Sequence, residues 1–159
     1  MPKKTKTGKI LESIVEDRFS REGFDIVMHS KWKKNKENYS KELLLKNVPY
    51  KTIYGHDGRT EFLLLSEKHN LRIRIECKWQ EQSGSADEKL PYLYLNAIEK
   101  FPERDVIILI AGPGFKKGSI PWLKHVAQHL PYTTDASHNK NIMVFSQTEF
   151  TVWANSKFI

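Results

Sequence analysis

The stretch RIECKWQ, residues 74–80, places an acidic side chain and a lysine two positions apart in a largely apolar setting. Successive side chains of a β-strand point to opposite faces, so Glu76 and Lys78 would share one face while Cys77 points to the other. A carboxylate is a ligand that Mg²⁺ prefers, and an ammonium beside it can orient water or stabilise developing negative charge. The pair fits half of a metal-dependent phosphodiester-cleaving site, and it also fits an ordinary surface ion pair.

A second carboxylate can reach the same point if EFLLL and LRIRIECKW form an antiparallel hairpin around SEKHN. A register that pairs Ser66 with Leu71 places Glu61 directly opposite Glu76. Opposed residues have Cβ atoms about 4.5–5.5 Å apart, and two carboxylates this close repel unless a cation lies between them. Asp57 has the same strand parity as Glu61 and stays open as the first metal ligand. In the alternative, both acids lie on a solvated face and are neutralised by Arg72, Arg74 and Lys78.

Hydrophobic spacing indicates which elements must support this hairpin. Helical periodicity predicts helices over 9–24, 89–101 and 120–130. Apolar or alternating runs predict strands over 24–28, 50–55, 61–65, 71–79, 105–112, 141–146 and 149–154. The polar and basic stretch 29–42 is predicted to be a loop. The order predicts a single α/β domain over residues 1–159, with a mixed β-sheet flanked by helices.

The arrangement of an acid on one strand, a tight turn, and acid-x-Lys on the next strand resembles the PD-(D/E)XK nuclease superfamily, which is restriction-endonuclease-like. The resembling residues are Glu61 in GRTEFLLL and Glu76 and Lys78 in IECK. The resemblance implies an αβββαβ core over residues 9–111. The usual first motif of that family is Pro-Asp, whereas this chain has Thr60 followed by Glu61.

The resemblance also implies roles for individual residues. The first helix of such nucleases often supplies another catalytic acid, for which Glu12 is the candidate and Glu16 the substitute. Gln80 is expected beside the substrate or the second helix, and Lys78 is expected to orient the attacking water or stabilise charge. Mg²⁺, with Mn²⁺ as a substitute, would be held by the Glu61 and Glu76 carboxylates and the Cys77 backbone carbonyl.

The chain carries 26 lysines and arginines against 19 acidic residues, a net charge of +7. Such a surface attracts anions, of which nucleic acid is the commonest large one. Basic runs and a tryptophan among them give the residues predicted to contact DNA: Lys31, Trp32, Lys33, Lys34, Lys36, Arg59, Lys89, Lys116 and Lys117, with the N-terminal lysines.

Cys77 is the only cysteine, which excludes an intrachain disulfide and a cysteine-based zinc site. Apolar runs are too short to span a membrane, and no apolar segment of secretory type follows the basic N-terminus. We therefore expect a soluble, cytoplasmic protein.

Together these features predict a Mg²⁺-dependent DNA endonuclease, restriction-type or phage-borne, that acts as a homodimer because one site cuts one strand. Three alternatives stay open. They are a Holliday-junction resolvase of the same fold, a DNA-binding protein of that fold that no longer cleaves, and a basic RNA-binding or assembly module in which ECK is a surface pair.

Overall fold

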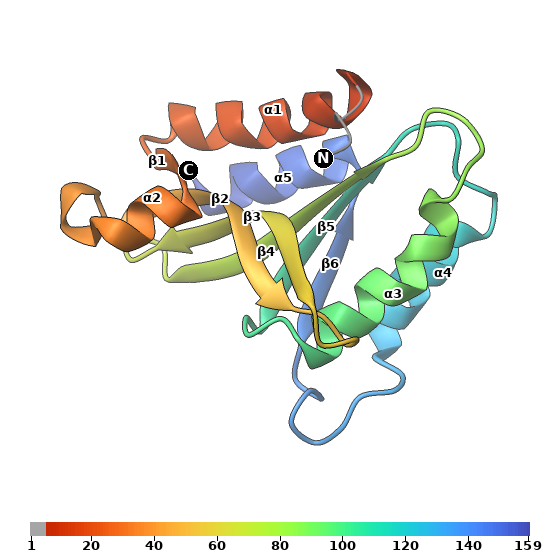
Figure 1. Cartoon of the computed structure of the whole chain (residues 1–159). Helices are drawn as coiled ribbons and strands as arrows, with labels where there is room; N and C mark the ends of the chain where they lie inside the picture. Colours follow the sequence, from red (N-terminus) through yellow and green to blue (C-terminus); the bar gives the residue numbers. More distant parts are fainter. Residues whose placement is uncertain (1–5) are drawn as a thin grey trace.

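The computed structural model describes residues 6–159, and side chains from residue 9 onward. The N-terminal lysines at positions 3 and 4 lie outside the described residues. Helices precede and follow three successive strands, β2, β3 and β4, and alternate with the remaining strands (Figure 1). The elements are α1 (Lys6–Arg21), β1 (Asp25–Met28), α2 (His29–Lys34), the 3₁₀ turn η1 (Lys36–Asn38), β2 (Glu42–Lys51), β3 (Asp57–Ser66), β4 (Leu71–Trp79), α3 (Ala86–Glu99), β5 (Asp105–Ala111), α4 (Ser119–His129), β6 (Asn141–Phe145) and α5 (Gln147–Lys157).

The strands form one mixed sheet in the order β1-β2-β3-β4-β5-β6. Strands β2, β3 and β4 form an antiparallel meander, while β1 runs parallel to β2, and β5 and β6 continue parallel to β4. The predicted α/β fold with a mixed sheet is confirmed. The apolar run in β5 is buried along its length, as expected of a central parallel strand covered on both faces.

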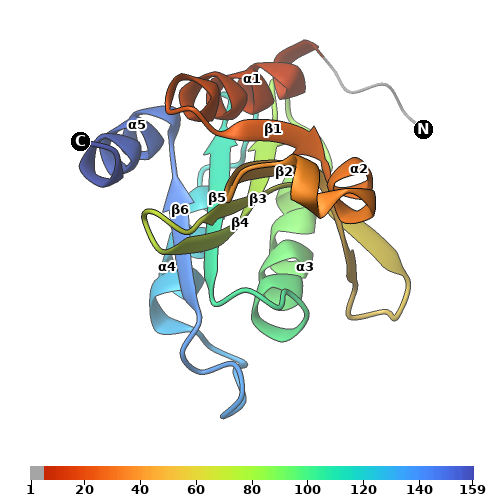
Figure 2. The same ribbon diagram turned by 90° about the vertical axis from the view of Figure 1, so that its left-hand side faces the viewer.

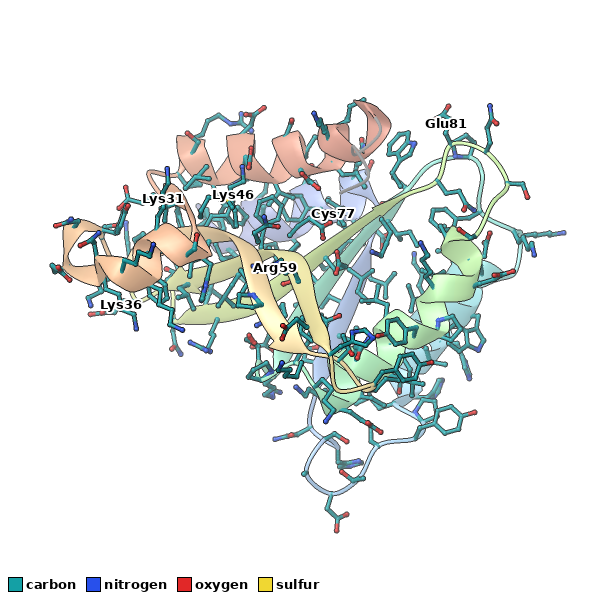
Figure 3. The ribbon with its side chains drawn as sticks, in the orientation of Figure 1. Lys31, Lys36, Lys46, Arg59, Cys77 and Glu81 are labelled. Carbon is teal, nitrogen blue, oxygen red and sulfur yellow. The ribbon has the colours of Figure 1, made fainter. Side chains whose placement is uncertain are left out.

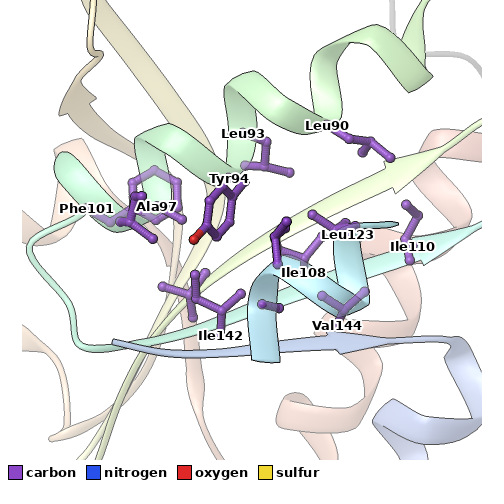
Figure 4. Packing of buried hydrophobic residues seen from close by; sticks show 14 residues of the cluster. Leu90, Leu93, Tyr94, Ala97, Phe101, Ile108, Ile110, Leu123, Ile142 and Val144 are labelled. Carbon is purple, nitrogen blue, oxygen red and sulfur yellow. The ribbon is translucent and has the colours of Figure 1, made fainter. Parts of the chain in front are cut away.

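Helices cover both faces of the sheet (Figures 1 and 2). On one face, α1 and α5 pack on a cluster that includes Phe19, Ile75 and Phe150. On the other face, α3 and α4 pack on β5 and β6 through residues such as Leu93 and Leu123 (Figure 4). Helix α2 lies against β1–β3, where its cluster includes alternate residues of β2.

Strand alternation places α2 on the same face as α3. Leu63 belongs to the α2 cluster and pairs with Arg74, which in turn pairs with Val106 of the α3 cluster. Paired residues point to the same face of a sheet. The stretch of β4 that carries Glu76 and Lys78 therefore faces the space between α2 and α3.

Most predicted elements are confirmed with ends shifted by a few residues, but three predictions are wrong. Residues 50–55 are not a strand of their own, because β2 begins at Glu42 and ends at Lys51. The predicted loop over 29–42 contains α2 and η1. The predicted strand over 149–154 lies inside α5.

Helix α5 shows why alternation misleads at the C-terminal end. Val152 continues the apolar alternation of the segment, yet it is 64% exposed, while Phe150 and Ala154 are buried. The buried pair follows the i, i+4 spacing of a helix. Ser146 begins the helix with a capping box, in which its hydroxyl accepts from the Glu149 amide at 3.1 Å and the Glu149 carboxylate accepts from the Ser146 amide at 3.2 Å.

Candidate active site

The site is built around a fork between β3 and β4. Their ladder runs from the Ser66–Leu71 pair to the Phe62–Ile75 pair and ends there. The predicted register is therefore confirmed along this ladder, but the next pair, Glu61 with Glu76, is not a ladder pair.

The ladder between β2 and β3 is interrupted at the same level. Lys46 pairs with Phe62 and Val48 with Thr60, so Asn47 and Glu61 fall between two ladder pairs. Asn47 adopts a left-handed conformation with φ of 56°, which asparagine tolerates better than most residues. Glu61 thus lies at a break in the pairing on both sides of β3.

The Glu61 side chain bridges the fork. Its Oε2 accepts a hydrogen bond from the backbone N–H of Cys77 at 3.2 Å. In an antiparallel pair, the N–H and C=O of one strand residue point toward the same neighbouring strand. The Cys77 carbonyl is therefore directed to the side on which the Glu61 carboxylate lies, one residue from Glu76.

Glu76 and Lys78 line a cleft of about 280 Å³ between the β2–β3 hairpin and α3. Glu76 is 5% exposed, and its carboxylate lies 3.7 Å from the Lys78 ammonium. Among the described residues, Lys78 is its only ionic partner within 4 Å. Cys77 points to the opposite face and is buried there, as predicted. The cleft is further lined by Tyr50, Thr52, His56, Asp57, Gly58, Arg59, Lys89, Tyr92, Leu93 and Asn96.

Tyr50 lines the cleft, within range of charges on both strands of the fork. Burial raises the pKa of the Tyr50 phenol, and Tyr92 and the Glu61 carboxylate raise it further, while Lys78 and Arg74 lower it. Both charges from the fork therefore act on the same phenol in the cleft.

The neighbouring arginine does not neutralise the two acids. Arg74 is buried and its Nε donates to the Glu103 carboxylate at 2.9 Å. Its Nη1 donates to the Val48 carbonyl at 3.3 Å and the Thr60 hydroxyl at 3.1 Å. Arg74 is thus committed to holding β2 and β3 in place, and the buried Glu76 does not belong to a solvated ion-pair face.

The candidate acids outside β4 lie in different surroundings. Glu12 and Glu61 line one hollow of about 190 Å³ on the α1 side, so the structure brings the predicted helical acid close to the fork. Glu16, the substitute, forms an ion pair with Lys46 at 2.6 Å. Asp57, the alternative first ligand, lines the cleft, but its 84% exposed side chain is 2.5 Å from the Lys51 ammonium, which lowers its pKa.

Gln80 lies at the end of β4 and has a structural task. Its amide nitrogen donates to the Asp87 carboxylate at 2.8 Å and to the Gly114 carbonyl at 2.9 Å, and its oxygen accepts from the Ala86 amide at 2.9 Å. Burial alone would raise the pKa of Asp87, but hydrogen bonds from Gln80, the Lys116 amide and other donors outweigh it and lower the pKa. The side chain expected beside the substrate or the second helix fixes the start of α3, which is that helix, against the loop after β5.

The predicted nucleic-acid contacts fall into separate regions. Lys31, Lys33 and Lys34 lie on α2, and the Lys36 ammonium lies 4.6 Å from the centre of the half-buried Trp32 ring. Figure 3 shows Lys31 and Lys36 at one end of the molecule and Arg59 on the hairpin. Lys89 lines the cleft itself. The loop after β5, which carries Lys116 and Lys117, lies at the other end, away from α2 (Figure 1).

His29, at the start of α2, is surrounded by positively charged side chains. Burial lowers the pKa of His29, and the charges of Lys33, Arg74, Arg59 and Lys36 lower it further. Basic residues of α2, η1 and β3 therefore lie near enough to His29 to act on its charge.

Sequence reasoning missed the cleft residues Tyr50, His56, Tyr92 and Asn96. The hairpin tip brings them together, because the Ile53 amide donates to the Asn96 side-chain oxygen on α3 at 2.8 Å. The aromatic residues flanking the GHDG turn were the available signal, but no spacing rule connects that turn to α3.

The donor set fits a small divalent cation, since two carboxylates and a backbone carbonyl are hard oxygen ligands. Over residues 6–159, no group of three or more His, Cys, Asp and Glu side chains could hold a metal ion. The coordination of a cation in the fork would thus be completed by the carbonyl and by water.

Within the described residues, 6–159, no helix has the length and apolar character needed to cross a membrane.

An αβββαβ core that carries two acids and a lysine around a strand fork is typical of nucleases. A family model described as a PD-(D/E)XK nuclease superfamily domain matches residues 3–158. The chain therefore belongs to the PD-(D/E)XK nuclease superfamily, and the suspected resemblance is confirmed. Membership implies phosphodiesterase activity on nucleic acid, and nucleases of this superfamily generally use divalent metals such as Mg²⁺. Neither the curated proteins nor the solved structures compared with the chain give a match.

Proposed function

We propose that the protein is a Mg²⁺-dependent DNA endonuclease. The observation that carries the proposal is the fork, where the Glu61 carboxylate reaches the Cys77 amide beside the buried Glu76. Burying a carboxylate is costly, so a site that keeps one has a use for its charge.

The Glu61 and Glu76 carboxylates and the Cys77 carbonyl would hold the cation. A bound Mg²⁺ lowers the pKa of its water and neutralises charge on the phosphate. Lys78, 3.7 Å from Glu76, would orient the attacking water or stabilise the developing negative charge. Glu12 would take part from the α1 side of the fork, since it lines the same hollow as Glu61.

Glutamate in place of the usual aspartate has a geometric counterpart. Its extra methylene lengthens the side chain, and Glu61 uses this length to reach across the fork to β4. An aspartate at position 61 would have to come closer through its backbone.

For the substrate, the positive field around α2 and Arg59 supports DNA binding through phosphates. Because one site cuts one strand, we propose a symmetric homodimer, whose two sites would cut both strands of a duplex or a junction. The segment SGSADEK after the motif favours a restriction-type or phage-borne enzyme, with a junction resolvase as the alternative.

Supercoiled plasmid incubated with Mg²⁺, and separately with EDTA, tests the proposal. The expected result is nicking or linearisation with Mg²⁺ alone, and Lys78→Ala should reduce the rate by about 10²–10⁴-fold with DNA affinity within a few-fold. Lys124→Ala, a surface change on α4, is the matched control and should cleave normally. Tight binding without cleavage would indicate a DNA-binding protein of this fold, and a preference for RNA would indicate an RNA-binding module.

A further inference from the structure

Two tyrosines form a stacked pair at the rim of the cleft. The rings of Tyr54 and Tyr92 are 5.1 Å apart between centroids and inclined by 27°. Tyr54 is nevertheless 73% exposed. A ring this exposed with one face against Tyr92 leaves its other face to solvent, and His56 lies 6.1 Å away at a tilt.

The Tyr54–Tyr92 pair forms a stacking platform, and contacts within the protein hold it in place. The Thr52 amide donates to the His56 carbonyl at 2.9 Å, and the Gly55 amide donates to the Thr52 carbonyl at 2.8 Å. The hydrogen bond from Ile53 to the fully buried Asn96 ties the turn to α3. Because these contacts already order the turn, a ligand that stacks on Tyr54 would lose little of its binding energy to ordering it.

The platform adjoins the groups that would act on a phosphate. Tyr92 and His56 line the same cleft as Glu76, Lys78 and Lys89. A nucleotide with its base on the tyrosines could place its phosphate between the two lysine ammonium groups. A flat apolar ring beside paired cations is the combination that binds single strands, since every base has a π-face and every nucleotide a phosphate.

We propose that Tyr54, supported by Tyr92, stacks an unpaired base of the strand whose phosphate enters the cleft. This inference rests on the proposed nuclease function and makes DNA with unpaired nucleotides at the cut its preferred substrate, such as single strands, flaps or junction branches. In continuous duplex DNA each base is covered by its neighbours, so the exposed face of Tyr54 finds no base to stack on.

Binding in EDTA tests the inference without cleavage. Fluorescence anisotropy would compare a single strand of about 12 nucleotides, a length such sites can cover, with the blunt duplex of the same sequence. Tyr54→Ala should weaken single-strand binding by roughly five- to 150-fold, the range that stacking of one base contributes, and should leave duplex binding within about twofold. Tyr54→Phe keeps the ring and should bind as the unchanged protein does. Tyr132→Ala is the control, because Tyr132 is a similarly exposed tyrosine, at 76%, outside the cleft.

A second measurement covers the case in which Tyr54→Ala fails to fold. A 2-aminopurine base in the single strand should lose fluorescence on binding to the unchanged protein if it stacks, and Tyr54→Phe should preserve that loss. Equal losses of single-strand and duplex affinity in Tyr54→Ala, or no quenching of any labelled position, would overturn the inference. Failure of Mg²⁺-dependent cleavage with this binding pattern intact would instead overturn the proposed function.

Discussion

The Glu61 carboxylate accepts a hydrogen bond from the Cys77 amide across the fork, at 3.2 Å. This contact joins two strands at the point where their backbone ladder has ended. Glu61 therefore has a structural acceptor role and, in the proposed function, a charged role at the cation. The two roles can be separated because the hydrogen bond needs an oxygen acceptor, whereas holding the cation needs the negative charge.

Glu61→Gln keeps an oxygen that can accept the Cys77 hydrogen bond but removes the negative charge. We expect it to melt within a few degrees of the unchanged protein and to lose cleavage by at least about 10²-fold, as for removal of a charged catalytic group. Glu61→Ala should lose cleavage and also about 0.5–1.5 kcal/mol of stability, the net worth of one hydrogen bond. Plasmid cleavage and thermal unfolding are the measurements.

Asp57→Ala decides between the two candidates for the first ligand. Its exposed carboxylate pairs with Lys51, so its loss should leave both cleavage and stability nearly unchanged. Loss of cleavage in Asp57→Ala together with activity in Glu61→Gln would transfer the ligand role to Asp57.

The α2 lysines should set the salt dependence of DNA binding. Replacing Lys33 and Lys34 together by alanine should reduce the slope of log K against log salt by about 1.8, from two lost phosphate contacts at about 0.9 each. The matched variant replaces Lys116 and Lys117 in the loop after β5, which lies at the other end of the molecule from α2 (Figure 1). A smaller change is expected there. The reverse ranking would show that DNA runs over the loop after β5 and not over α2.

Breaking the buried ion pair between Arg74 and Glu103 should lower the free energy of unfolding strongly. Glu103→Ala leaves the Arg74 guanidinium buried, with its Nε partner removed, and should cost about 3–5 kcal/mol in urea unfolding. Lys124→Ala breaks an exposed pair with Glu149 and should cost less than about 1 kcal/mol. Similar costs for the two variants would mean that the Arg74 network does not hold the hairpin.

The cap of α5 gives a pH dependence. The pKa of Glu149 is lowered by its hydrogen bond with the Ser146 amide and by Lys124. A lowered pKa stabilises the fold above the ordinary value of 4.5, and this contribution is lost as the pH falls through the lowered pKa. Glu149→Gln keeps the cap acceptor, so at pH 7 it should cost less than about 1 kcal/mol because the side chain is half exposed.

That difference between Glu149→Gln and the unchanged protein should shrink progressively below pH 4.5 in unfolding curves measured across the acid range. A difference that stays constant from pH 7 to pH 3 would remove the charge of Glu149 from the stability of the cap.

Local pattern predicted much of the fold. β4 and β5 were found because their apolar runs are long and bounded, and α1, α3 and α4 because their buried faces follow helical spacing. β2 was misplaced because LLLKNVPY has no alternation, since Leu44 is buried toward α1 and its neighbours toward α2. α5 was missed because Val152 imitates strand alternation on an exposed helix face.

Some residues of the candidate site could likewise be predicted from the sequence, and others could not. Glu76 and Lys78 were predictable because two positions on one strand fix their common face. Glu61 needed the register of a neighbouring strand, and the pairing that would have set it stops one residue short. Tyr54, Tyr92 and Asn96 could not be predicted, because they meet only when the hairpin tip docks on α3.

The junction between β4 and the loop after β5 leaves no room for a side chain. A Cβ at Gly112 would lie 2.3 Å from the Gln80 carbonyl oxygen, and one at Gly114 would lie 2.5 Å from the Gln82 backbone. In a randomised library screened for solubility alone, nearly every soluble variant should keep both glycines, while position 78 should accept many residue types. When the same library is sorted for cleavage, position 78 should become restricted to lysine, and the glycines should be no more restricted than before. The two screens would therefore separate residues needed for folding from residues needed for cleavage.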